Sequence, residues 1–278
     1  MHTPIHLAFL RSVPGFQDPF SSLTHLGGAG VFAALSFFLI RRGLRAEHGV
    51  HRGRVASLAV FACSAVLLLT MSGVFHLLSP GAGRDVLQRL DHAAIFLLIA
   101  GTFTPMHTIL FRGPWRWGML AFIWTIAILG VTLKSIFFAS LPAWAGTLLY
   151  VGMGWVGVLS FATLVRRHRP RGFRFARHLI FGGIAYTIGA ALELIDPPPL
   201  IMGVVRSHEV FHIAVLAGLG LHWRFIWKIA ARAMPQGPPR GANGPIGHGP
   251  WGVSNGESGI GGSSAHASPL ATRSKSRN

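Results

Sequence analysis

The sequence predicts an all-α fold, a polytopic membrane protein built as a bundle of seven transmembrane helices, and three observations support this prediction. Hydrophobic residues make up 51% of the 278 residues and charged residues only 12%, whereas soluble domains carry about 25% charged residues. The mean hydropathy is +0.49. The apolar residues gather into runs of about 20, the length that an α-helix needs to cross the hydrocarbon core of a bilayer.

Seven runs satisfy this criterion. Their length and low charge identify them, because they are apolar on nearly every face and show no useful periodicity. In chain order the predicted spans are Leu23–Ile40, Val55–Leu78, Asp91–Phe111, Trp117–Phe138, Leu141–Val165, His178–Ile195 and Ser207–Ala230.

Charged or helix-breaking residues mark the ends of these runs. Arg41 follows the first run, and Arg54 precedes the second. Arg112 follows the third. Only a few residues around Pro142 separate the fourth and fifth runs, which predicts a tight helical hairpin. Arg166 follows the fifth run, and glycines are frequent in the fifth and sixth, as expected where membrane helices approach closely.

The basic residues alternate between the two sides of the membrane. The chain has 25 Lys and Arg against eight Asp and Glu, a net charge of +17. In a soluble protein this charge would indicate nucleic acid, but here the arginines gather in the short loops between apolar runs. Twenty basic residues fall on one side and four on the other. The sequence therefore predicts an inner or plasma membrane protein with its N-terminus outside and its C-terminus in the cytoplasm, and no nucleic-acid partner.

The transmembrane domain is flanked by a short N-terminal segment and a polar C-terminal tail. Residues 1–22 form a short N-terminal segment without the pattern of a cleavable signal peptide, and residues 23–230 form the transmembrane domain. Residues 235–278 are rich in Gly, Pro, Ser and Arg and are predicted to be a disordered tail. Cys63 is the one cysteine of the chain, so no intrachain disulfide is expected.

Ionisable residues within the spans are predicted to gather near one side of the membrane, the side with few arginines. Because such groups are costly inside a bilayer, they are treated as functional by default. Lys134 and Glu193 are expected to reach the interface as snorkelling side chains. His25 either lies at the wet interface or joins the site, and His92 is expected to have a supporting or interfacial role. The set comprises the ionisable residues His25, His76, Asp91, His92, Lys134, Glu193, His208, Glu209 and His212, together with the polar Ser72.

Three histidines have the spacing of a zinc site. His208 and His212 are four residues apart and share one helix face, and His76 ends a neighbouring predicted span. Three imidazole nitrogens leave the fourth zinc position open, which is typical of catalytic sites. Asp91 is placed to act as a general base or only to orient the water. Ser72, one turn before His76, could hold the water or an oxyanion.

The motif His208-Glu-Val-Phe-His212 also matches the zincin signature, in which the Glu is the general base. Glu209 is rotated about 100° from His208 around the helix. We therefore expect Glu209 to face a neighbouring helix or the wet surface, and an intramembrane zinc protease stays an alternative.

Several short runs resemble a known family. They are Leu23-Thr-His-Leu-Gly27, Ser72-Gly-Val-Phe-His76, Leu90-Asp-His-Ala-Ala-Ile95, Ala100-Gly-Thr-Phe-Thr-Pro105, Gly152-Met-Gly-Trp155, Gly182-Gly-Ile-Ala-Tyr186 and His208-Glu-Val-Phe-His212. The resemblance is to the hemolysin III family, which belongs with the progestin and adiponectin receptors and, more distantly, with the alkaline ceramidases. It covers about residues 22–227. The ordered Ser/His, Asp and His/His set makes it specific.

The resemblance implies a seven-helix membrane fold in which His76, His208 and His212 hold Zn²⁺. It also implies that Asp91 bonds to the zinc water and that Ser72 lies nearby. The related ceramidases imply hydrolysis of lipid amides, with membrane lipids as partners and substrate.

Three features limit the resemblance. The family pattern in the last span is His-x-x-x-His, so Glu209 is not implied as a base. Phe75 replaces the Tyr that often precedes the histidine of the second span. The adiponectin receptors place their N-terminus inside, opposite to the orientation that the arginines here predict.

The sequence thus predicts an integral membrane zinc protein, expected to hydrolyse lipid amides or esters in the manner of a ceramidase. Enzymatic turnover is left open by the residues themselves. The alternatives are a membrane-stress sensor or receptor with a structural zinc and a hemolysin-like pore-former. The pore-former has the weaker support, because no span carries a ladder of polar residues.

Overall fold

The computed structural model describes residues 17–46, 51–167, 171–198 and 205–232, and the predicted tail at 235–278 lies outside these ranges. The regular structure of the described residues is α-helical, which confirms the predicted fold class. The helices are α2 (Pro19–Leu44), α3 (Arg52–Leu77), α4 (Ala82–Leu110), α5 (Gly113–Ile136), the short 3-10 helix η1 (Phe138–Ser140), α6 (Ala143–Trp155), α7 (Gly157–Arg167), α8 (Gly172–Ile195) and α9 (Ser207–Ile229).

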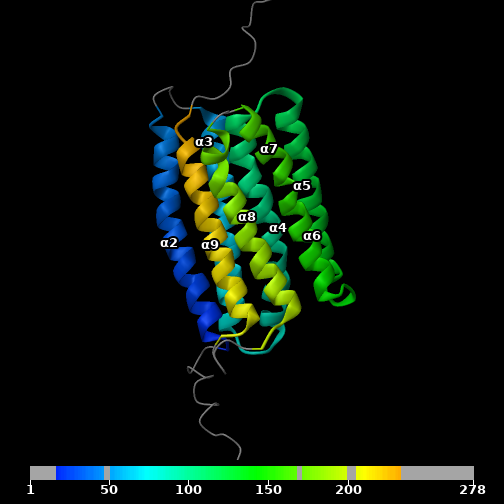
Figure 1. Cartoon of the computed structure of the whole chain (residues 1–278). Helices are drawn as coiled ribbons and strands as arrows, with labels where there is room; N and C mark the ends of the chain where they lie inside the picture. Colours follow the sequence, from blue (N-terminus) through cyan, green and yellow to red (C-terminus); the bar gives the residue numbers. More distant parts are fainter. Residues whose placement is uncertain (1–16, 47–50, 168–170, 199–204, 233–278) are drawn as a thin grey trace, which may run out of the picture. The chain divides into compact units, whose positions relative to one another are not determined.

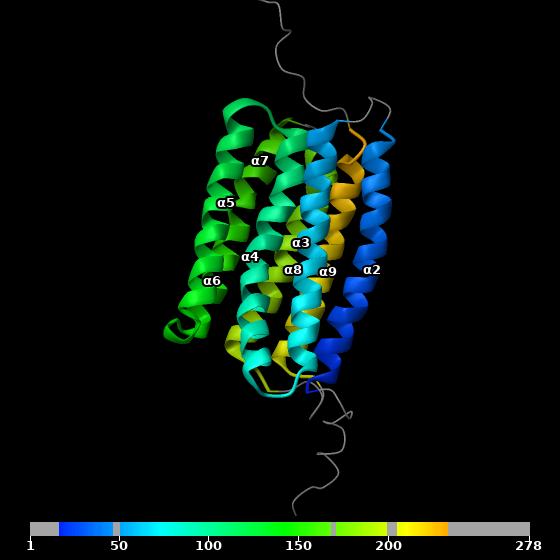
Figure 2. The ribbon, with the colours of Figure 1, turned by 180° about the vertical axis from the view of Figure 1, so that it is seen from behind.

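Seven membrane-length helical segments are found among the described residues, as the sequence predicts. Helices that follow one another along the chain lie side by side, namely α2 with α3, α3 with α4, α4 with α5, and α8 with α9. The last helix, α9, also contacts α2 and α4, which closes these elements into a bundle (Figures 1 and 2). The α6 and α7 helices lie against α8 on the side of the bundle away from α2.

The fifth span, Trp144–Arg167, consists of two helices rather than one. The break falls at Val156, in a stretch where Gly152, Gly154 and Gly157 weaken the helix. The Leu159 N–H donates to the Val156 carbonyl at 3.1 Å, a three-residue spacing that tightens the turn. The break brings Gly154, Gly157 and neighbouring residues to the wall of an internal cavity.

The α4 helix begins at Ala82, so Asp91 lies within the helix rather than at its start. Arg84 and Asp85, which precede the predicted span, lie in the first turns of α4 rather than in a loop. The apolar run begins only near Asp91, but a helix can continue past the apolar part of its sequence where it leaves the membrane. The extra turns bring Arg84 Nη2 within 3.2 Å of Asp18 Oδ2.

Arginine side chains bind helix C-termini at the end of the bundle away from the histidines. Arg54 is buried, and its guanidinium donates to the carbonyls of Gly43 and Arg232 at 3.1 and 3.0 Å. The Arg42 guanidinium donates to the Trp227 carbonyl at 3.0 Å. Since the last carbonyls of a helix lack partners within it, these contacts stabilise the ends of α2 and α9.

Candidate metal centre and its cavity

Three histidines from two helices meet near one end of the bundle. His76 lies in the last turn of α3, and His208 and His212 lie in the first two turns of α9. One nitrogen from each ring lies within 4.8 Å of the others. His76 and His212 are almost fully buried, at 3% and 2% exposure. The structure therefore brings together the three side chains that the sequence singled out as metal ligands.

Two carboxylates fix two of these imidazoles. The Nδ1 atom of His76 lies 3.2 Å from Asp18 Oδ2, and the Nδ1 atom of His208 lies 3.0 Å from Glu193 Oε1. A carboxylate that accepts a hydrogen bond from Nδ1–H leaves the Nε2 lone pair free for a metal ion. The hydrogen bond with His76 holds the pKa of Asp18 below its usual value, which favours the ionised acceptor.

The two free Nε2 atoms face each other. The Nε2 atoms of His76 and His208 are 3.1 Å apart. If both Nδ1 atoms donate their protons to carboxylates, both Nε2 atoms present lone pairs, which repel unless a cation lies between them. Two nitrogens bound to one zinc ion at ~2.0–2.1 Å in tetrahedral geometry are roughly 3.3 Å apart. The donor set and its spacing therefore fit a metal ion.

His212 and His25 complete the polar core of the site. The Nδ1 atom of His212 is buried and has no hydrogen-bond partner among the described residues. The His25 ring from α2 stacks on His212 with centroids 3.9 Å apart, and neither of its nitrogens has a partner in the described part of the chain. The sequence allowed two positions for His25, at the wet interface or in the site. The structure places it, almost fully buried, beside the histidine cluster.

The segment before α2 is held against the end of α3, which is what positions Asp18. The backbone N–H of Asp18 donates to the carbonyl of His76 at 3.0 Å, and the Ser22 hydroxyl donates to the carbonyl of Gly73 at 2.9 Å. The first bond satisfies a carbonyl that the last turn of α3 leaves without a partner, and the second adds a further contact between α2 and α3. Sequence reasoning missed Asp18 because it precedes the apolar run, where depth cannot be assigned.

Asp91 and Ser72 lie beside the histidines. Both residues line the same cavity as His208 and His212. Their side chains lie near each other, and His208 lies within electrostatic range of the Asp91 carboxylate. The two side chains that the sequence proposed for water activation are thus neighbours, on α3 and α4.

Glu209 points away from a catalytic position. Its Oε2 accepts a hydrogen bond from the Arg206 backbone N–H at 2.8 Å, and it lies 3.9 Å from the Arg206 guanidinium. This contact caps the start of α9. The sequence placed Glu209 against a neighbouring helix or the wet surface. In the structure the side chain instead turns back to its own helix terminus.

The sequence expectation of snorkelling is wrong for Lys134 and incomplete for Glu193. Lys134 is only 3% exposed and lines the internal cavity. Helix α6 covers it, a contact that the sequence of α5 alone does not reveal. Glu193 is partly exposed, but its carboxylate binds His208 and so belongs to the histidine cluster. His92 also lines the cavity, with its Nδ1 bonded to the Gln88 carbonyl at 2.8 Å.

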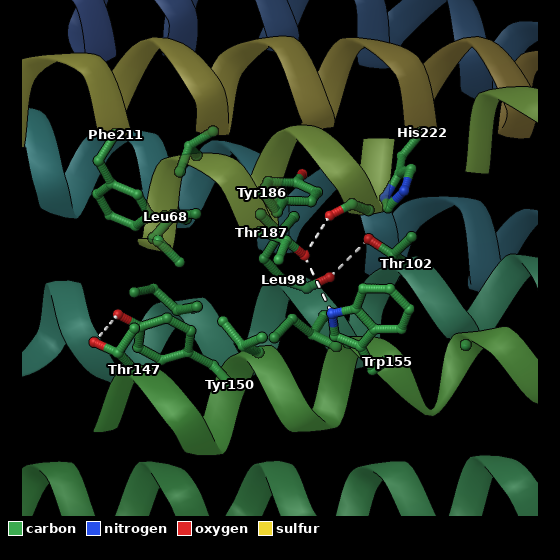
Figure 3. A pocket seen from close by; sticks show the side chains of 18 of the residues that line it. Leu68, Leu98, Thr102, Thr147, Tyr150, Trp155, Tyr186, Thr187, Phe211 and His222 are labelled. Atoms are coloured by element: carbon green, nitrogen blue, oxygen red, sulfur yellow. Dashed lines mark hydrogen bonds between the residues drawn. The ribbon is translucent and has the colours of Figure 1, made fainter. Parts of the chain in front are cut away.

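A cavity of about 290 Å³ extends from the histidine cluster into the bundle. Its lining is mostly apolar and aromatic, and it comes from α3, α4, α6, α7, α8 and α9, with His25 of α2 and Lys134 of α5. Figure 3 shows part of this lining. His212 and His222 both line it, and their separation of ten positions corresponds to about 15 Å along α9. Tyr150, Trp155 and Tyr186 project into the region that Figure 3 shows. The histidine cluster therefore opens onto an elongated, mostly apolar space.

A model of the haemolysin-III-related family matches residues 16–223, which is most of the chain. The chain belongs to this family. Hemolysin-3 of Bacillus cereus is 34% identical over 198 residues, which cover 71% of this chain and 84% of that protein. The Hemolysin-3 homolog of Bacillus subtilis (strain 168) is 28% identical over 198 residues, covering 71% and 87% of the two chains.

A more distant relative comes from animals. The adiponectin receptor protein of Drosophila melanogaster is 25% identical over 255 residues, which cover 81% of this chain and 56% of that protein. These matches confirm the family predicted from the sequence, including its link to the adiponectin receptors. Together with the seven apolar helices, they identify the haemolysin-III-related chain as an integral membrane protein.

Proposed function

We propose that this protein is a zinc-dependent hydrolase that cleaves amide or ester bonds of membrane lipids. The observation that carries the proposal is the single cavity that joins the histidine cluster, Asp91 and Ser72 to a long apolar space. An acyl chain fits that space by its chemistry, and its polar linkage would then lie at the cluster.

The metal is proposed as zinc because of its ligands. Three imidazoles, two of them hydrogen-bonded to carboxylates, match the ligand set of catalytic zinc sites. The three ligands include no thiolate, which would favour copper or an iron–sulfur centre. When bound, zinc polarises carbonyl groups and acidifies water. His76, His208 and His212 would hold it, oriented by Asp18 and Glu193.

Asp91 and Ser72 supply the proton chemistry under this proposal. The Asp91 carboxylate takes the proton of the attacking water and passes it to the leaving amine or alcohol. The Ser72 hydroxyl lies beside that carboxylate in the cavity wall, where it would hold the attacking water. Asp91 and Ser72, the polar side chains that would hold an attacking water, lie beside His208 in a cavity wall that is otherwise mostly apolar.

A receptor or stress sensor with a structural metal is the second candidate. It is favoured by the similarity to an adiponectin receptor protein and would use the same histidines without turnover. A pore-former has less support, because the described cavity is lined mainly by apolar side chains.

One experiment separates the enzyme from the receptor. Purified wild-type protein and the His76→Ala variant are analysed for zinc and incubated with long-chain amides and esters, while released fatty acid is measured. We expect about one zinc per wild-type chain, release by the wild type, and loss of both in the variant. Zinc without release from any lipid would support the receptor. Absence of zinc from the wild type would exclude the site as proposed.

A further inference from the structure

Lys134 is a buried cation for which the described residues offer no counter-ion. It lies in the last turn of α5, it is 3% exposed, and it lines the internal cavity. Among the described residues no hydrogen bond or ion pair to its ammonium is found. Among the same residues the ammonium makes one cation–π contact, with the ring of Phe138, whose centroid lies 5.3 Å from Nζ.

Two local features stabilise this charge without neutralising it. The C-terminal end of a helix favours a cation, and an aromatic ring attracts one. Neither replaces the hydrogen bonds that three N–H groups make in water, so burial of an unpaired ammonium remains strongly unfavourable. Such a group is retained where an anion completes the site.

The α6 helix holds the ammonium in place. A Cβ atom at Gly146 would lie 2.4 Å from both Cε and Nζ of Lys134. The side chain therefore occupies space that only a glycine leaves open. Because Nζ is the far end of a flexible chain, a larger residue at this position would move the ammonium rather than break the fold.

Polar side chains line the same cavity as Lys134. Thr147 and Tyr150, one turn apart on α6, share a hydrogen bond of 2.8 Å between their hydroxyl groups (Figure 3). His92 also contacts the Phe138 ring, with ring centroids 5.2 Å apart. The histidine cluster and these polar side chains line one cavity, whose remaining wall is mostly apolar.

We propose that Lys134 is the counter-ion for an anionic head group, a carboxylate or a phosphate, on an acyl chain that enters the cavity. The ammonium binds the anion while the apolar wall binds the chain. This inference rests on the proposed function only in that the cavity takes up a lipid; it requires no turnover.

Binding of matched amphiphiles tests the inference. Purified protein in nanodiscs of neutral lipid is titrated with a long-chain fatty acid and with an alkyl phosphate, alcohol and amine of equal chain length. We expect the wild type to bind one or both anions at least about tenfold more tightly than the alcohol, because hydrogen bonds to charged groups have that strength. The fatty acid and phosphate arms show which anion is taken.

Four variants test whether Lys134 causes the preference for the anion over the alcohol. Lys134→Met should bind the anion and the alcohol equally, with unchanged zinc content, and Lys134→Arg should keep the preference. Gly146→Ala should weaken the preference by displacing the ammonium. Gly152→Ala is the matched control on the same helix, since a Cβ there meets nothing within 4 Å, and it should behave as the wild type.

The outcomes separate the two proposals. A wild type that binds none of the amphiphiles would show that the cavity is not a lipid site, and both would fall. A wild type without preference, or a Lys134→Met variant that keeps it, would overturn the counter-ion while the lipid site stands. If Lys134→Met does not fold, Gly146→Ala decides: retention of the full preference would overturn the inference.

Discussion

Two carboxylates determine which imidazole nitrogens are available to a metal ion. The histidines themselves were predictable, because spacing of four on a helix and a third histidine at the same predicted depth are visible in the sequence. Their partners were not. Asp18 reaches His76 through backbone bonds between the N-terminal segment and the end of α3. Glu193 reaches His208 because α8 and α9 lie side by side.

Removal of either carboxylate is expected to weaken the metal site without removing a ligand. Asp18→Ala and Glu193→Ala should each lower zinc affinity about 10–100-fold, because an unsupported imidazole loses its tautomer and orientation. Competition with a chelator of known affinity measures the change. Asp85→Ala, an exposed acid in the first turn of α4, is the control. Equal affinity in all variants would show that the carboxylates do not orient the ligands.

The two acids near the cluster are expected to differ in their effect on turnover. Asp91→Asn should lower hydrolysis by ~10²-fold or more with zinc still bound, since it removes a general base. Glu209→Gln should have a much smaller effect, because Glu209 already accepts the Arg206 N–H at the start of α9. Rates and zinc content are measured on the same preparations. An inactive Glu209→Gln with an active Asp91→Asn would favour the protease alternative.

At the scale of helices, hydropathy located every span but not every helix. The start of α4 at Ala82 and the break at Val156 were both missed. An apolar run reports which residues lie in lipid, whereas a helix extends as far as its backbone bonds do. A short interruption such as the one between α6 and α7 leaves hydropathy unchanged. Burial of Lys134 was missed for a similar reason, because it depends on the approach of α6.

Close approach of α4 and α5 provides a test of helix packing. A Cβ at Gly130 would lie 2.5 Å from the ring of Phe96, which is fully buried. Gly130→Ala should therefore lower the free energy of unfolding by about 1–3 kcal/mol, as other overpacked substitutions do. Gly118→Ala on the same helix meets nothing within 4 Å. Both substitutions replace a helical glycine by alanine and gain the same helix propensity. The difference in unfolding free energy between the two variants therefore measures the contact with Phe96.

Denaturant unfolding of the two variants in detergent measures this difference. We expect Gly118→Ala to stay within about 0.5 kcal/mol of the wild type. Equal stability of the two variants would mean that α4 and α5 lie farther apart than the structure places them.

At the scale of the whole protein, most of the arginines that the structure describes lie at the end of the helices opposite to the histidine cluster. Some of the arginines also serve the fold, since Arg42 and Arg54 bind carbonyls at the ends of α2 and α9. Their structural role does not cancel their effect on insertion, which depends on charge next to the spans. The positive end should therefore be cytoplasmic, and the metal site should face the outside.

Reporter fusions test this orientation. Twenty basic residues against four predict that a reporter placed after Asn278 is active if it works only in the cytoplasm, and silent if it works only outside. The same reporters placed before Met1 should give the opposite pattern, because seven spans put the two termini on opposite sides. The reversed pattern at both termini would place the histidine cluster in the cytoplasmic half of the membrane. A hydrolase of that orientation would act on lipids of the inner leaflet, so the reporters also decide on which leaflet substrates should be sought.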